Sequence, residues 1–394
     1  LAAVASVALA APAFAWDFSA SGSSSAKWMQ ETVTPASGDA TVDTNFTSSS
    51  GGVTVSSSNT DGANSATFSY TADWNGDDGN FDEYVSVSGS KKVGNWTASS
   101  ATTQHMQKDA TATTGAQPMT GGASAVITLT DGSITYKLGD AAHLSTAEKA
   151  VNGPMSGTVD AEARVDSFQG FSVGLGVGPG ALTVALDLEA GTSDTAFGDQ
   201  SIAIACGGGS SGFGLNFSGD VGADLSFTYA SASSTASGRT CTVSDNNSDS
   251  AAAANTMGLG VAVPLGGITL ALDYESSHVE ATAGGGSVTA VTTGSDKSGF
   301  ELSVTMGMGD ATVGLNVSSQ TVTPTTTAAG ATANNASSTA GTELWYSVPI
   351  GAVTLAAGYG SAAVTTGGSN TVGAVTADAT TTTTQIGATM SMSF

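Results

Sequence analysis

The last ten residues, Gln385–Phe394 (Q-I-G-A-T-M-S-M-S-F), decide the fold class. Apolar side chains occupy every second position from Ile386 to Phe394, and glycine, threonine or serine fills the positions between them. A period of two is the pattern of a β-strand that has one apolar face and one small polar face. Such a strand lies between an apolar and an aqueous environment. In a soluble sandwich the apolar environment is a packed core, and in a membrane barrel it is lipid.

The same alternation recurs along the chain, with short turns between the runs. Each run is roughly eight to ten residues long, close to the length that a tilted strand needs to cross a bilayer. The alternating runs are 66–74, 171–177, 182–188, 257–263, 268–274, 300–306 and 344–350. The turns contain Gly, Asp, Asn or Pro, which tolerate or fix the backbone angles of tight turns. They lie at 59–63, 91–95, 130–133, 178–181, 218–222, 264–267, 307–310 and 349–352.

Long, polar connections alternate with these short turns. They are Ser231–Asn255, Glu280–Lys297, Thr321–Gly341 and Ala362–Thr380. Short turns at one end and long loops at the other are typical of outer-membrane barrels, and a soluble sandwich has no reason to sort its loops in this way. The sequence therefore predicts an all-β, transmembrane antiparallel β-barrel. Eight internal turns imply 18 strands, and 16 strands remain the alternative because the faces of the early segments, 17–30 and 41–58, are poorly marked.

Composition and charge exclude several classes of protein. The chain has 394 residues and a net charge of -24, from 9 basic and 33 acidic residues, but only 11% of it is charged. Because no basic patch is available to meet phosphates, we expect no nucleic-acid partner. Residues 1–15 are apolar or small and end in Ala13-Phe14-Ala15, which predicts a signal peptide followed by a barrel over 16–394. Cys206 and Cys241 are the two cysteines, and in an exported protein we expect them to form a disulfide.

The amphipathic last strand with its terminal aromatic residue resembles the closing strand of Gram-negative outer-membrane general porins. This resemblance implies that Phe394 is read by the barrel-assembly machinery, that the protein lies in the bacterial outer membrane in contact with lipid, and that it forms a homotrimer. It also implies a passive channel for small hydrophilic solutes and ions.

A second resemblance concerns the segment after the strand at 133–139. The run from Ala123 to Ser145 is similar to the porin segment that leads into the constriction loop, which folds into the barrel. This implies an inward-folded loop at 140–166, with a short helical patch at 147–151. By our count it is the fourth long loop, whereas general porins use the third. The resemblance implies the following residues at the pore constriction: Glu148, Lys149, Asp160, Glu162, Arg164 and Asp166.

Charged residues that alternate with apolar ones are expected to line the pore wall. The acidic candidates are Asp73, Asp187, Asp273 and Glu301, and the basic ones are Lys27 and Lys137, which the resemblance places across from the inward loop. Because the acidic residues outnumber the basic ones, we expect a preference for cations.

Catalysis and metal binding have little support in the sequence. The three histidines, His105, His143 and His278, form no recognisable set with a nucleophile and a carboxylate, so we expect no enzymatic activity and no catalytic residues. The segment Asp73–Asp82 resembles a calcium loop weakly, because Tyr84 stands where a bidentate Glu is required. Calcium in an external loop therefore stays open as an alternative to a solvated acidic loop, and no other cofactor or metal is expected. The alternative function is that of a secreted structural or adhesive β-protein, similar to a surface-layer protein.

Overall fold

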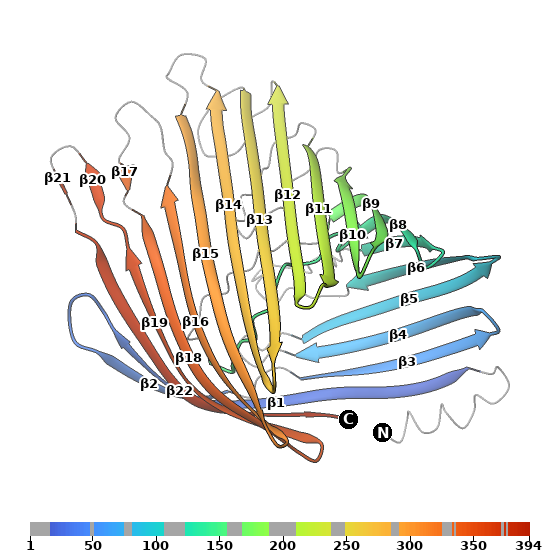
Figure 1. The fold of residues 1–394 in the computed structure, drawn as a ribbon, viewed down its shortest axis with the longest axis horizontal. Helices are drawn as coiled ribbons and strands as arrows, with labels where there is room; N and C mark the ends of the chain where they lie inside the picture. The colour runs from blue at the N-terminus through green and yellow to red at the C-terminus, as the bar shows by residue number, and fades with distance from the viewer. Residues whose placement is uncertain are drawn as a thin grey trace, which may run out of the picture.

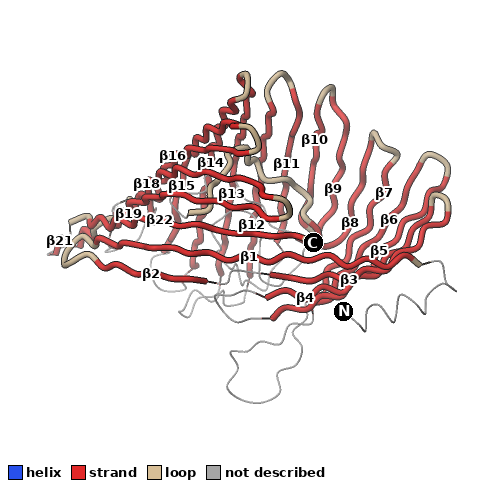
Figure 2. The backbone as a smooth tube through the Cα atoms, turned by 90° about the horizontal axis from the view of Figure 1, so that it is seen from below, coloured by secondary structure: helices blue, strands red, loops and turns tan. Residues whose placement is uncertain are grey.

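The computed structural model describes residues 16–47, 51–74, 81–105, 123–155, 168–188, 210–237, 249–284, 291–324, 333–334, 336–371, 374–375 and 377–394. Every regular element in these ranges is a β-strand (Figures 1 and 2). The helical patch that we expected at 147–151 is wrong, because these residues run without helical structure. Among the described residues, no helix is long and apolar enough to cross a membrane.

The strands follow one another along the chain as antiparallel neighbours. Their bounds are β1 Asp17–Thr34, β2 Thr41–Thr47, β3 Gly51–Asp61, β4 Asn64–Trp74, β5 Phe81–Val93, β6 Trp96–His105, β7 Ala123–Thr130, β8 Ile134–Ala141, β9 Phe168–Val177, β10 Gly180–Asp187, β11 Ser210–Asp220, β12 Asp224–Ser237, β13 Asp249–Leu265, β14 Ile268–Gly284, β15 Val291–Met308, β16 Ala311–Pro324, β17 Ala333–Asn334, β18 Ser337–Ile350, β19 Val353–Thr366, β20 Ser369–Thr371, β21 Ala374–Val375 and β22 Ala379–Ser393.

The main sheet closes on itself into a barrel of 18 strands. One edge of β1 pairs with β22 from Ser23 to Thr34. The other edge pairs with β3 over its first half and with β2 over its second half, so β2 and β3 together fill one position in the ring. The count of 18 that the eight turns predicted is confirmed, and the alternative of 16 is wrong. The short strands β17, β20 and β21 form a separate sheet of 3 strands outside this ring.

All eight predicted turns connect neighbouring strands, and several strands are longer than the sequence indicated. Glycines at six of these turns have φ between 58° and 65°, a region that glycine enters without a steric penalty: Gly62, Gly94, Gly178, Gly266, Gly309 and Gly351. Strands β13, β14 and β15 have 17, 17 and 18 residues and extend into segments that we predicted as loops. The sequence did not indicate these extensions because small and polar residues make up most of them, so large apolar side chains do not mark every second position.

The two faces of the barrel differ as the alternation predicts. On β14 the side chains of Ile268, Leu270 and Leu272 are 37–42% exposed and point outward. Asp273 and Glu275 on the same strand point inward and are each 1% exposed. Closure leaves no unpaired strand edge, which lipid could not satisfy. The apolar exterior is covered by no other part of the protein that the structure describes, and such a band around a closed barrel is what contacts lipid in outer-membrane barrels.

Candidate functional site: the barrel interior and its inner loop

The chain between β8 and β9 turns into the barrel. We call its described part, residues 142–155, the inner loop. Shortly before this loop the chain bends inward within β8 at Gly139, which has a φ of 124°. A Cβ atom at this position would lie 2.0 Å from the carbonyl oxygen of Ala125, so only glycine fits without moving the backbone. Close by, the Lys137 ammonium donates to the carbonyl of Ala142 at 3.3 Å.

His143 fixes the root of the inner loop. Its Nε2 lies 2.9 Å from the carbonyl oxygen of Gly139, and because a carbonyl can only accept, this nitrogen carries the proton. Nδ1 then accepts from the Ser172 hydroxyl at 3.0 Å. The imidazole ring lies against the ring of Phe168, with 4.7 Å between the centroids. The side chain of Leu144 next to it is buried with Phe168, Ala185 and Ala230, which gives the root a small apolar core.

The inner loop next crosses β11 and β12. The carbonyl oxygen of Ser145 accepts hydrogen bonds from Asn216 of β11 at 3.2 Å and from the Thr228 hydroxyl of β12 at 2.6 Å. Both wall residues are buried, at 3% and 0% exposure. These buried polar side chains bond the loop backbone to β11 and β12.

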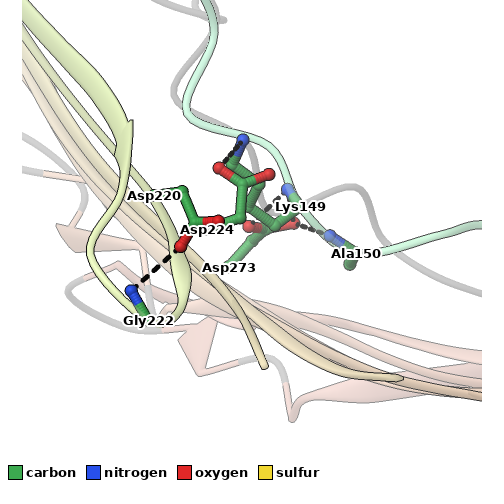
Figure 3. A network of polar contacts seen from close by, with 6 residues as sticks. All are labelled: Lys149, Ala150, Asp220, Gly222, Asp224 and Asp273. Carbon is green, nitrogen blue, oxygen red and sulfur yellow. Dashed lines mark hydrogen bonds and ion pairs between the residues drawn. The ribbon is translucent and has the colours of Figure 1, made fainter. Parts of the chain in front are cut away.

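Asp273 of β14 forms hydrogen bonds with the middle of the inner loop. Its carboxylate accepts from the backbone N–H of Lys149 at 2.8 Å and from that of Ala150 at 2.6 Å (Figure 3). The Lys149 ammonium forms an ion pair of 2.9 Å with Asp224 at the start of β12. Hydrogen bonds from N–H groups to a carboxylate are among the stronger ones in proteins. Asp273 therefore fastens the loop backbone to the wall.

Glu343 of β18 fastens the end of the described loop in the same way. Its carboxylate accepts from the backbone N–H of Met155 at 2.6 Å and from that of Gly153 at 3.2 Å. A Cβ atom at Gly153 would lie 2.3 Å from Oε1 of Glu343 and 2.3 Å from Cδ1 of Trp345. The tight approach of loop and wall therefore requires glycine at this position.

Between these two carboxylates, strands β15 and β16 supply neutral partners. The backbone N–H of Val151 donates to the Ser303 hydroxyl at 3.1 Å, and the carbonyl of Val151 accepts from Asn316 at 2.6 Å. Asn316 also lies 3.1 Å from the carboxylate of Glu301. From Ser145 to Met155 the inner loop thus bonds side chains of β11, β12, β14, β15, β16 and β18.

An ion pair lies on the inner face next to this contact. The Lys297 ammonium of β15 is 3.1 Å from the Glu275 carboxylate of β14, and the two side chains are 5% and 1% exposed. Gln320 of β16 donates to the same carboxylate at 2.8 Å. A buried pair that is also hydrogen-bonded leaves little net charge to act on a passing ion.

The structure places the predicted site residues in different surroundings. Glu148, in the middle of the inner loop, is exposed. Asp187, Asp273 and Glu301 are on the inner face but are 5%, 1% and 1% exposed. Lys27 lies on the inner face of β1, directly opposite Thr389 of β22.

Several predicted residues lie outside the described ranges. They are Asp160, Glu162, Arg164, Asp166, Cys206 and Cys241, together with residues 1–15 and most of the calcium-like segment.

Sequence reasoning missed the wall residues that hold the inner loop: Asn216, Thr228, Ser303, Asn316 and Glu343. The signal that could have found Glu343 is present, because it occupies the polar side of an alternating strand as Asp273 does. The small residues Ser303 and Thr228 carry no such signal, since serine and threonine occupy inward positions throughout the barrel.

The closing contact of the barrel involves the last residue. The N–H of Phe394 donates to the carbonyl of Gly22 at 2.9 Å, and the N–H of Gly22 donates to the carbonyl of Phe394 at 2.8 Å. A Cβ atom at Gly22 would lie 2.6 Å from the Phe394 ring. Glycine at this position of β1 therefore leaves the space that the terminal ring occupies.

A closed barrel of 18 strands with an apolar exterior, a polar interior and an inward loop is the fold of outer-membrane porins. The protein is accordingly a β-barrel of the bacterial outer membrane. Our alternative, a secreted surface-layer protein, does not explain this fold, because a protein outside the membrane would expose the apolar exterior of the barrel to water.

One solved structure supports this fold. The outer membrane channel DcaP of Acinetobacter baumannii matches with a TM-score of 0.52 over 96% of this chain and 97% of its own, at 11% identity. An anion-selective porin from Comamonas acidovorans matches with a TM-score of 0.49 over 96% of this chain and 100% of its own, at 14% identity. At these identities the likeness concerns the fold alone. Neither a protein-family model nor a curated protein matches the sequence.

Proposed function

We propose that this protein is a passive diffusion channel that admits small hydrophilic solutes and ions, prefers cations, and carries out no enzymatic reaction. The observation that carries the proposal is the inner loop, which is fastened along one side of the interior by Asp273 and Glu343. A loop held in this way narrows the lumen at a fixed place, and a fixed narrow segment is how a pore selects by size and charge.

The preference for cations follows from the distribution of charge. The chain carries a net charge of -24. In the inner loop Glu148 is exposed, whereas the neighbouring Lys149 is paired with Asp224. The constriction then presents a carboxylate to a passing ion and holds its ammonium group in an ion pair. Asp160, Glu162, Arg164 and Asp166, further along the same segment, are proposed to complete the constriction.

Reversal potentials in a salt gradient test this proposal. Purified protein in a planar bilayer should give stepwise conductance, and a KCl gradient should give a reversal potential of the sign for cation preference. Glu148→Gln, or Asp160→Asn with Glu162→Gln, should reduce that potential. The control is Asp310→Asn in the exposed turn after β15, where salt screens the charge within about 8–10 Å. Equal effects from Glu148→Gln and the control would contradict the constriction role of the inner loop.

The resemblance to general porins supports a trimer and the recognition of Phe394, whereas the apolar start of the sequence and its two cysteines support a signal peptide and a disulfide. We propose a homotrimer, delivery by a signal peptide at 1–15, a disulfide between Cys206 and Cys241, and recognition of Phe394 by the barrel-assembly machinery. Crosslinking of the protein in native membranes would detect the trimer, and a thiol count in denatured, unreduced protein would detect the disulfide. Two free thiols would contradict the pairing.

A further inference from the structure

The wall that the inner loop leaves uncovered carries an unbroken row of hydroxyl groups. Strand pairing places six residues from β1, β3, β4, β5, β6 and β7 directly side by side. In order across the sheet they are Ser19, Ser56, Ser69, Ser86, Thr103 and Ser124. We call these six residues the hydroxyl row. Ser19 is exposed and the other five are half-buried, so solutes in the interior can reach all of them.

Register shows that the hydroxyl row faces the interior. Ser172, which bonds His143 of the inner loop, is paired with Lys137, and Lys137 is paired with Thr128. The pairing continues from Thr128 through Ser99 and Ser90 to Ser65 on β4. Ser69 lies four residues after Ser65 on the same strand and therefore on the same face.

Neighbouring hydroxyls on this wall are paired with one another. Thr54 and Thr71 lie 2.9 Å apart, Ser65 and Ser90 2.8 Å, and Ser86 and Thr103 2.9 Å. A hydroxyl is both a donor and an acceptor with two lone pairs, so each member of a pair can still bond a further group. Such pairs can exchange a partner for water or for a solute hydroxyl at small cost.

On β3 to β7 the inward charged side chains lie near the ends of the strands, whereas β1 at the edge of this wall carries Lys27 on its inner face. Among the described side chains of β3 to β7, the inward charged residues are Asp73, next to the last residue of β4, and Lys92, next to the last residue of β5. Successive antiparallel strands end at opposite rims, so these two charges lie at opposite ends of the barrel. The resemblance to general porins implied a basic wall across from the loop, and in this region serine and threonine occupy its place.

From these observations we infer the class of solute that this channel favours: uncharged polyhydroxylated molecules, such as sugar alcohols and small sugars. This inference rests on the proposed channel function. A polyol gives up hydrogen bonds to water when it enters a narrow lumen, and the hydroxyl row supplies donors and acceptors of the same kind in return. A solute can also displace the water next to neutral hydroxyl groups more easily than the water that hydrates fixed charges.

Swelling of liposomes that contain the purified protein tests the inference. The probes are xylitol and triethylene glycol, an uncharged polyether with few donors, and the measured quantity is the ratio of their entry rates. The test variant combines Ser69→Ala, Ser86→Ala and Thr103→Val on the inward face. The matched control combines Ser57→Ala, Ser100→Ala and Thr102→Val, whose side chains point outward by register.

We expect wild type to admit xylitol faster than the polyether. The test variant should lower the ratio by about two- to tenfold, the range that the loss of one net hydrogen bond gives. The control should leave it unchanged, and KCl conductance should persist in both. An unchanged ratio in the test variant, with intact KCl conductance, would overturn the inference. If the test variant does not insert, Thr103→Val alone replaces it. Independently of any variant, equal entry rates of xylitol and the polyether in wild type would overturn the inference. A wild-type protein that conducts neither KCl nor xylitol would instead refute the channel itself.

Discussion

At the scale of single residues, the contacts between the inner loop and the wall leave no space for added atoms. Gly153 shows this most clearly, since its missing Cβ would lie 2.3 Å from both the Glu343 carboxylate and the Trp345 ring. Glu343 and Trp345 are 0% and 7% exposed, so neither can move away freely. The position of this loop therefore depends on one glycine.

Gly153→Ala should displace the end of the inner loop. Overpacking of this kind costs about 1–3 kcal/mol, and we expect it to appear as altered single-channel conductance and added current noise. Gly307→Ala is the control, because a Cβ atom there meets no atom within 4 Å and the backbone is not in the left-handed region. Conductance of Gly153→Ala indistinguishable from that of the control would contradict the close contact.

Asp131 shows how a turn residue couples folding to pH. Its carboxylate accepts from the backbone N–H of Ile134 at 2.9 Å and from the N–H and hydroxyl of Ser133. These bonds, led by the one from Ile134, lower the pKa of Asp131 below its ordinary value of 3.8. A carboxyl group whose pKa is lower in the folded state stabilises the fold above its unfolded pKa, and this contribution is lost as the pH falls through the folded value.

The melting temperature of wild type should therefore exceed that of Asp131→Ala at neutral pH. The difference should stay constant down to about pH 5 and shrink below about pH 3.8. Thermal unfolding of both proteins across this range is the measurement. A difference that does not change with pH would show that the carboxylate is not what stabilises this turn.

At the scale of elements, the inner loop has no regular structure of its own and takes its path from the strands beneath it. Two carboxylates on β14 and β18 bond four backbone N–H groups of the loop, at Lys149, Ala150, Gly153 and Met155. Because these bonds go to backbone groups, they do not depend on the loop side chains, apart from the glycine that the close contact requires at position 153. The wall therefore fixes the path of the loop.

Removing the two carboxylates should release the inner loop while the barrel remains. For Asp273→Asn with Glu343→Gln we expect higher and noisier single-channel conductance, because an amide keeps the shape but accepts these bonds more weakly. The cost is about 1–3 kcal/mol for each site. Asp187→Asn is the control, since Asp187 is also an inward carboxylate but lies on β10. A double variant with the conductance of wild type would contradict the fastening role.

Sequence could predict the strands but not the partners of the inner loop. A period of two separates inward from outward positions on any strand, and so it distinguishes Asp273 and Glu301 from their apolar neighbours. The same pattern cannot show that the inner loop covers these two side chains. Their burial depends on contacts between residues far apart in the sequence, such as Asp273 and Lys149, which are separated by 124 positions. The helical patch expected at 147–151 was wrong for the same reason: hydrogen bonds to the wall replace those of a helix.

At the scale of the whole molecule, closure of the ring depends on β1 and β22. These strands pair over twelve residues, from Ser23–Ser393 to Thr34–Thr382, and Phe394 extends the contact to Gly22. Because a closed barrel leaves no unpaired strand edge in lipid, this last contact is part of the membrane structure itself.

Deletion of Phe394 should lower the yield of folded, membrane-inserted protein, since it removes two backbone hydrogen bonds and the ring over Gly22. Phe394→Ser retains the backbone bonds and separates the role of the ring. Phe300→Ser, on the lipid-facing side of β15, is the control for the loss of an exposed aromatic residue. The measurement is the fraction that migrates as the compact band on an unheated gel. Insertion of both Phe394 variants at the control level would contradict a role of this residue in closure.

The central claim is that the barrel is an open, water-filled channel narrowed by the inner loop. Single-channel recording compares wild type with a variant in which residues 146–154 are replaced by a short Gly-Ser linker. We predict stepwise conductance for wild type and larger steps, with weaker cation preference, for the shortened loop. Folded wild-type protein that inserts without conducting, or equal steps in both proteins, would contradict the claim.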